Sequence, residues 1–118
     1  RFIDETNIEL LAVGIGNAHG FYSSTDSIDI NLLKKVHHKI PNQKLVLHGG
    51  TGIEPEKIME MKCYGIHKIN VSTELKDVYL KASKFHLDSD KKFEMISLVN
   101  NRYKSVKNTA KRKILEFK

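Results

Sequence analysis

The chain has few of the residues that cross-link a protein or anchor it in a membrane. Among its 118 residues there are one cysteine, two prolines and no tryptophan. The single Cys63 cannot form an internal disulfide, which is typical of a reducing compartment and predicts a cytoplasmic protein. No apolar run approaches the roughly 18 residues of a spanning helix, so we expect no membrane association. The sequence begins at Arg1 without a signal region, which we interpret as a processed or truncated start.

Acidic residues are scarce at one end of the chain. The net charge is +6, but residues 1–90 hold eleven Lys and Arg against twelve Asp and Glu, whereas residues 91–118 hold nine against two. The positive charge therefore belongs to a basic helical tail at about residues 89–118, and any nucleic-acid binding has to rest on that tail. The tail's aromatic residues lie near its apolar stripe, which favours a solvated helix face over a nucleic-acid surface.

Three short apolar runs, each followed by a helical pattern, organise the rest of the chain. The runs cover residues 10–16, 45–47 and 66–71, and the first two are nearly continuous, as in buried parallel strands. Helices are expected to begin at Asp29 as a cap, near Pro55, and at Thr73 as a cap. Repeated strand–loop–helix units predict an α/β fold with parallel strands, as part of a (β/α)8 barrel or of an open sheet.

Apolar residues at spacings of three and four predict which helix faces are buried. A final helix is expected after residue 90, with its lysines mostly off the apolar stripe. The side chains on these apolar stripes are Leu32, Leu33 and Val36 in the first helix, Ile58, Met61 and Cys63 in the second, Leu75, Val78, Tyr79, Ala82 and Phe85 in the third, and Ile96, Val99, Tyr103, Val106, Ala110 and Ile114 in the last.

Two histidines follow two of the strands in matching positions. His19 lies beyond the first strand and His48 directly follows the second, and a glycine comes after each. Neutral imidazoles at the ends of adjacent strands can converge on one metal ion such as zinc. Each histidine could equally donate a hydrogen bond to a substrate or to a loop carbonyl.

Two loops also have the composition of an anion site. Residues 48–52 (HGGTG) place backbone N–H groups and a hydroxyl before one helix, and residues 70–73 (NVST) do the same before the next. Glycine allows a close backbone approach, and a helix N-terminus carries partial positive charge. Turn and cap chemistry explains either loop alone, but two such loops in succession favour a phosphate site.

Three segments together resemble the class II, zinc-dependent ketose-bisphosphate aldolases, which act on fructose or tagatose 1,6-bisphosphate. They are residues 11–22 (LAVGIGNAHGFY), 45–53 (LVLHGGTGI) and 68–76 (KINVSTELK), and they occur in the family's order and spacing. The resemblance runs from about residue 8 into the tail. It implies that the chain is the C-terminal portion of one barrel, the last three βα units followed by the C-terminal helices.

The resemblance implies a role for each residue that matches a family motif. His19 and His48 correspond to zinc ligands, and zinc polarises the ketose carbonyl during reversible aldol cleavage to dihydroxyacetone phosphate and glyceraldehyde 3-phosphate. A monovalent cation (Na⁺ or K⁺) beside the phosphate, and a dimer or tetramer, are further family features. The residues implied in substrate and phosphate binding are Gly20, Gly49, Gly50, Thr51, Asn70, Val71, Ser72, Thr73 and Lys76.

The chain departs from the family pattern in several places. Thr51 stands where serine is more common, and Ser23 where many members have a phosphate-binding lysine. Lys76 stands where fructose-type enzymes often have an arginine. This one residue does not decide whether the substrate is the fructose or the tagatose bisphosphate. The family's catalytic aspartate and third zinc histidine have no counterpart here, so we expect the isolated chain to be inactive.

Two other interpretations remain open at this stage. A metal-free phosphate-binding barrel of the Schiff-base aldolase type would use Lys68 as its nucleophile, although an ordinary strand-end lysine is the simpler explanation. The chain could also be an inactive remnant whose basic tail binds a partner.

Overall fold

The computed structural model describes residues 2–21 and 27–118, which divide into two compact units, Arg1–Val71 and Ser72–Lys118. Across this described part of the chain, no helix is both long and apolar enough to cross a bilayer. The first unit contains, in chain order, α1 (Phe2–Thr6), β1 (Leu10–Ala12), α2 (Ile30–Lys39), β2 (Lys44–Leu47), α3 (Pro55–Cys63) and β3 (Ile66–Ile69). The second unit contains α4 (Thr73–Leu87) and α5 (Met95–Glu116).

The three strands form one parallel sheet whose spatial order, β1–β2–β3, is also the order along the chain. Leu11 pairs with Leu45, and Leu45 pairs with Ile66. The register between β2 and β3 then shifts, because Val46 pairs with Lys68 and the ladder passes over one residue of β3. Successive strands joined by helices in this way confirm the predicted α/β class and the parallel βαβ connections.

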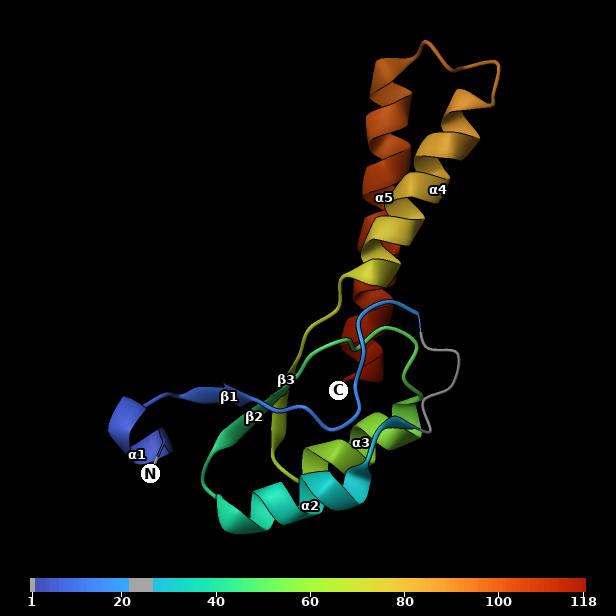
Figure 1. The fold of residues 1–118 in the computed structure, drawn as a ribbon. Helices are drawn as coiled ribbons and strands as arrows, with labels where there is room; N and C mark the ends of the chain where they lie inside the picture. The colour runs from blue at the N-terminus through green and yellow to red at the C-terminus, as the bar shows by residue number, and fades with distance from the viewer. Residues whose placement is uncertain (1, 22–26) are drawn as a thin grey trace. The chain divides into compact units, whose positions relative to one another are not determined.

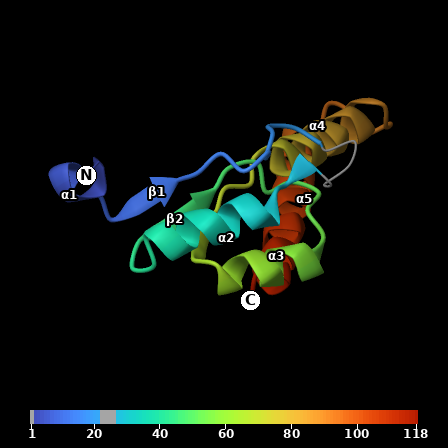
Figure 2. The ribbon, with the colours of Figure 1, turned by 60° about the horizontal axis from the view of Figure 1, so that its bottom comes forward.

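Helices α2 and α3 lie side by side on one face of the sheet (Figures 1 and 2). The core of this unit is formed by fully buried aliphatic side chains from the sheet and from both helices. These include Leu33 of α2, Leu45 and Leu47 of β2, and Ile58 and Met61 of α3. Three parallel strands with helices against one face are consistent with a segment of a barrel, and closure of a full barrel stays a prediction.

Within the first unit, two of the predicted inward side chains, Leu32 and Cys63, face solvent instead. Leu32 is exposed because it lies one residue, and so about 100° around the helix, from the buried Leu33. Cys63 is exposed at the last residue of α3, where its thiol lies 3.5 Å from the Met59 carbonyl oxygen. The predictions for Leu33, Ile58 and Met61 are confirmed.

The predicted helix starts are confirmed for α2 and α3. The Asp29 carboxylate accepts a hydrogen bond from the Leu32 backbone N–H at 2.8 Å, as an N-cap residue does. Proline opens α3 at Pro55, where a missing N–H costs nothing. At α4 the prediction was off by one residue, because Ser72 occupies the cap position and Thr73 is already helical.

The second unit is a helical hairpin in which α4 and α5 lie side by side (Figure 1). The apolar stripe of α5 was predicted to be buried. This prediction is wrong, since Ile96 is 79% exposed and Ile114 is 67% exposed. Val99 and Tyr103 of that stripe are exposed as well, and so are Tyr79 and Phe85 of the predicted α4 stripe. The buried side chains of α5 are Leu98, Thr109 and Lys113.

Polar contacts between the helices explain which face of α5 is buried. Arg102 donates to the Tyr79 hydroxyl at 2.7 Å, and its guanidinium lies 5.0 Å from the centre of that ring. Lys113, only 7% exposed, pairs with Glu74 at 3.1 Å and with Glu116 at 2.7 Å. Arg112 pairs with the same two carboxylates, and Glu74 raises the pKa of its guanidinium. Periodicity of apolar residues cannot detect a face held by ion pairs.

Candidate functional site

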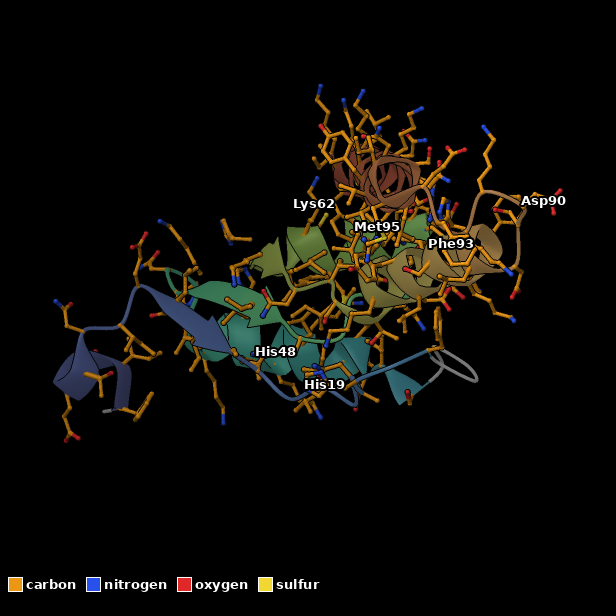
Figure 3. The ribbon with its side chains drawn as sticks, turned by 90° about the horizontal axis from the view of Figure 1, so that it is seen from above. His19, His48, Lys62, Asp90, Phe93 and Met95 are labelled. Atoms are coloured by element: carbon orange, nitrogen blue, oxygen red, sulfur yellow. The ribbon has the colours of Figure 1, made fainter. Side chains whose placement is uncertain are left out.

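Two histidines meet at the carboxyl end of the parallel sheet. His48 follows the last residue of β2 directly, and His19 lies in the loop after β1. Their ring centres are 5.9 Å apart, with an angle of 65° between the ring planes (Figure 3). Both side chains are exposed. The sequence prediction that the two loops bring these imidazoles together is therefore confirmed in the structure.

Asn17 links the loop that carries His19 to the loop that carries His48. Its side-chain oxygen accepts a hydrogen bond from the Ile15 N–H at 2.9 Å, and its amide nitrogen donates to the His48 carbonyl oxygen at 3.0 Å. In the Asn17 side chain the amide oxygen accepts one hydrogen bond and the amide nitrogen donates one. These two bonds define which way the amide group faces. Asn17 thereby fixes the His48 backbone against the β1 loop, two residues before His19.

A second asparagine contacts the His48 ring. Asn70 follows β3 directly, and its amide nitrogen lies 3.3 Å from His48 Nδ1. The Asn70 oxygen accepts a hydrogen bond from the Lys68 ammonium at 2.7 Å. Lys68, Asn70 and His48 therefore form a chain of hydrogen bonds from β3 to the end of β2.

The loops after β2 and β3 also approach each other through their backbones. The Gly50 N–H donates to the Asn70 carbonyl oxygen at 2.8 Å, and Asn70 N–H donates to Leu47 O at 2.9 Å. A Cβ atom added at Gly50 would collide with the Ile69 side chain and would lie 3.2 Å from the Asn70 oxygen. Glycine is needed at position 50 because β3 leaves no room for a side chain.

The other predicted substrate-binding residues lie around this centre or at the start of the second unit. Gly20 and Gly49 have φ angles of 107° and 69°, which glycine adopts at little cost. Thr51 is only 2% exposed. Val71 ends the first unit, whereas Ser72, Thr73 and Lys76 lie at the cap and first turn of α4 in the second unit. Ser23 lies outside the described residues.

The imidazoles of His19 and His48 are donors of a kind that zinc binds. Imidazole nitrogens are common zinc ligands, and a zinc site needs three or four ligands in all. Among the residues that the structure describes, no group of three or more His, Cys, Asp or Glu could hold a metal ion. Within the described residues, His19 and His48 are therefore the candidate nitrogen ligands.

Sequence reasoning missed the roles of Asn17 and Lys68. Asn17 lies two residues before His19 in a glycine-rich loop. Asparagine side chains often form hydrogen bonds with the backbone of loops, so the residue type was the available signal. Lys68 was considered as a nucleophile, but the structure engages its ammonium with Asn70. His67 Nδ1 lies 2.7 Å from the carbonyl oxygen of Gly65, the residue before β3.

The chain is similar to known proteins of one family. The family model described as "Fructose-bisphosphate aldolase class-II" matches residues 1–118. A fructose-bisphosphate aldolase of Ureaplasma parvum serovar 3 is 34% identical, over 94% of this chain and 40% of the relative.

Two solved structures have a similar fold. The crystal structure of the YdjI aldolase from Escherichia coli K12 superposes with a TM-score of 0.78 and 31% identity, over 98% of this chain and 41% of that one. A putative fructose-1,6-biphosphate aldolase from Coccidioides immitis superposes with a TM-score of 0.69. At 23% identity, over 90% of this chain and 38% of that one, the second structure supports the fold alone. The chain thus spans about 40% of the length of these relatives.

Proposed function

The chain belongs to the class-II fructose-bisphosphate aldolase family, and from this premise we propose that it is the C-terminal part of a zinc-dependent ketose-1,6-bisphosphate aldolase. The proposed reaction is the reversible aldol cleavage of fructose or tagatose 1,6-bisphosphate to dihydroxyacetone phosphate and glyceraldehyde 3-phosphate. The observation that carries the proposal is the pairing of His19 and His48, with ring centres 5.9 Å apart at the carboxyl end of adjacent parallel strands.

His19 and His48 are the proposed metal ligands of this chain. When bound, zinc supplies Lewis acidity that polarises a ketose carbonyl. The chain's own contribution is to present two imidazoles close together, with the His48 backbone held by Asn17 and the His48 ring contacted by Asn70. Ligands held in advance by neighbouring groups bind a metal more tightly than mobile ones, because less ordering is required on binding.

Residues 48–51 and 70–71, all in the first unit, are proposed to contact the substrate's phosphate end. Backbone N–H groups beside Gly20 and Gly49 can approach an anion closely, and α3 and α4 both begin just beyond these loops. Thr51, Ser72 and Thr73 complete the proposed contacts, with a monovalent cation held by loop carbonyls. Lys76, exposed in the first turn of α4, supplies positive charge for the second phosphate.

The third zinc ligand and the catalytic base come, in this proposal, from outside these 118 residues. The support is that the chain spans about 40% of its relatives' length and that no group of three possible ligands is present among the described residues. The isolated chain is then inactive, and the complete cytoplasmic enzyme, a dimer or tetramer, is active in carbohydrate metabolism. Exposed apolar side chains on α5, such as Ile96 and Leu115, are available for subunit contacts.

Zinc titration of the chain tests the metal site. We expect the wild-type chain to bind one zinc ion, and His19→Ala or His48→Ala to weaken binding by about tenfold or more. His38→Ala is the matched control, because it removes an exposed imidazole from α2. Equal affinity in all three variants would contradict the proposed ligands.

Borohydride reduction in the presence of dihydroxyacetone phosphate separates this proposal from a Schiff-base enzyme. A metal-dependent aldolase forms no covalent adduct with a lysine, so the mass of the chain should not change. A substrate adduct mapped to Lys68 would overturn the proposal in favour of the alternative.

A further inference from the structure

Two hydrogen bonds connect Lys68 to His48 through the side-chain amide of Asn70. The Lys68 ammonium has only donor hydrogens, so the Asn70 atom that it contacts at 2.7 Å has to be the carbonyl oxygen. The other half of the same amide, its NH₂ group, then faces His48 Nδ1 at 3.3 Å. An NH₂ group can only donate, and His48 Nδ1 therefore has to accept.

We propose that Lys68 is a positioning residue which, through Asn70, holds His48 in the tautomer with the proton on Nε2 and an unprotonated Nδ1. Lys68 fixes which way the Asn70 amide faces, and the amide fixes which His48 nitrogen is free of a proton. Without Lys68, Asn70 could rotate by 180° about its last bond and offer its oxygen to His48, which favours the opposite tautomer.

The consequence for metal binding rests on the proposed function. A metal ion binds a ring nitrogen that carries no proton, and which nitrogen is free is set by the partners of the ring. With Nδ1 unprotonated, this is the atom of His48 ready to bind zinc. The Asn70 hydrogen bond at 3.3 Å is long and therefore weak, so a metal ion can displace it.

His67 provides an internal reference for the opposite state. Its Nδ1 lies 2.7 Å from the Gly65 carbonyl oxygen, which can only accept. The neutral His67 ring must therefore carry its proton on Nδ1. One protein thus holds two histidines, 19 positions apart, whose predicted tautomers differ.

Nitrogen-15 NMR of the metal-free chain, at about pH 8 where imidazoles are neutral, measures both tautomers directly. We expect the Nε2–H form at His48 and the Nδ1–H form at His67. Lys68→Met should lower the tautomer ratio at His48 by about twofold, the effect of losing one weak hydrogen bond. Lys68→Arg should restore the ratio, because a guanidinium still donates to Asn70.

Asn70→Asp tests the role of the Asn70 amide most directly. A carboxylate of the same shape can only accept, so His48 should change to the Nδ1–H tautomer. Lys44→Met is the matched control, because it removes the β2 lysine that pairs with Glu9 and should leave His48 unchanged. The His67 signal reports in each variant whether the sheet is still folded.

The proposal is overturned by a wild-type His48 in the Nδ1–H form, or by a His48 ratio that Lys68→Met leaves unchanged while His67 keeps its tautomer. Adding zinc alone then tests the proposed metal site separately from the positioning role of Lys68. A shift at His48 Nδ1 supports both. No zinc binding, with the tautomers as expected, overturns the metal site and leaves the positioning role of Lys68 supported.

Discussion

The side-chain amide of Asn17 donates a hydrogen bond to the main-chain oxygen of His48 at 3.0 Å, across 31 positions of sequence. This single contact connects the loop after β1 with the end of β2. It fixes the spacing of the two candidate metal ligands, because His19 lies in the same loop as Asn17. Asn17 therefore connects the loop of one candidate ligand to the backbone of the other.

Replacing Asn17 by alanine should loosen the histidine pair. We expect Asn17→Ala to lower the free energy of unfolding by about 0.5–1.5 kcal/mol and to weaken zinc affinity by about tenfold, since the His48 carbonyl and Ile15 N–H both lose a partner. Chemical denaturation and zinc titration measure the two effects. Asn42→Ala, an exposed change in the loop before β2, is the control. Unchanged zinc affinity would show that Asn17 does not organise the site.

Position 50 should not accept even a methyl group. Gly50→Ala places a Cβ against the Ile69 side chain and near the Asn70 oxygen, and should cost about 1–3 kcal/mol of stability. Gly14→Ala is the matched control, because an added Cβ there meets no described atom within 4 Å. Urea unfolding compares the two variants. A Gly50→Ala chain as stable as Gly14→Ala would mean that β3 does not approach the loop as closely as described.

The hairpin of the second unit should depend on Glu74. Its carboxylate pairs with Arg112 and with the buried Lys113, so Glu74→Ala should cost about 1–3 kcal/mol by leaving a buried cation with fewer partners. Adding Lys113→Met should recover part of that loss, because the buried charge is removed as well. Thermal unfolding of α-helical circular dichroism measures both.

Asp77→Asn is the control for this experiment. It breaks a solvent-exposed pair with Lys81 on the same helix and should cost about 0.5 kcal/mol or less. Equal losses from Glu74→Ala and Asp77→Asn would contradict the importance given to the buried pair.

Acid should weaken the same hairpin through Glu116. Desolvation raises the pKa of its carboxyl, but the hydrogen bonds and charges of Lys113 and Arg112 outweigh that effect and leave the pKa below its usual value. A carboxyl with a lowered pKa stabilises the folded state above its unfolded pKa, and the contribution is lost as the pH falls through the folded value. The unfolding free energy should therefore decrease between about pH 5 and pH 3, with a smaller slope in Glu116→Gln. An identical slope in the variant would exclude Glu116 as the cause.

Features encoded over a few neighbouring residues could be predicted from the sequence. The Asp29 cap, the proline that opens α3 and the strand before His48 depend on local chemistry, and all three are present. The two histidines could be placed together because the carboxyl ends of parallel strands meet at one edge of a sheet.

Features that depend on a distant partner could not be predicted in the same way. The buried face of α5 is chosen by Glu74 and Tyr79 on α4, so the more apolar stripe with Ile96 and Ile114 remains exposed. Asn17 and Lys68 act through contacts with other loops and strands, and nothing in their immediate neighbours indicates those partners. Gly50 was predicted to let the backbone approach an anion closely. The structure adds that the absence of a side chain at Gly50 also leaves room for Ile69 of β3.

X-ray absorption at the zinc edge of the zinc-loaded chain tests most directly whether His19 and His48 form a metal centre. The account predicts two imidazole nitrogens at about 2.0–2.1 Å, with the rest of the coordination made up by oxygen from solvent, and one imidazole fewer in His48→Ala. Sulfur scattering at about 2.3 Å, which would place the metal on Cys63, or an imidazole count that His48→Ala leaves unchanged, would contradict it.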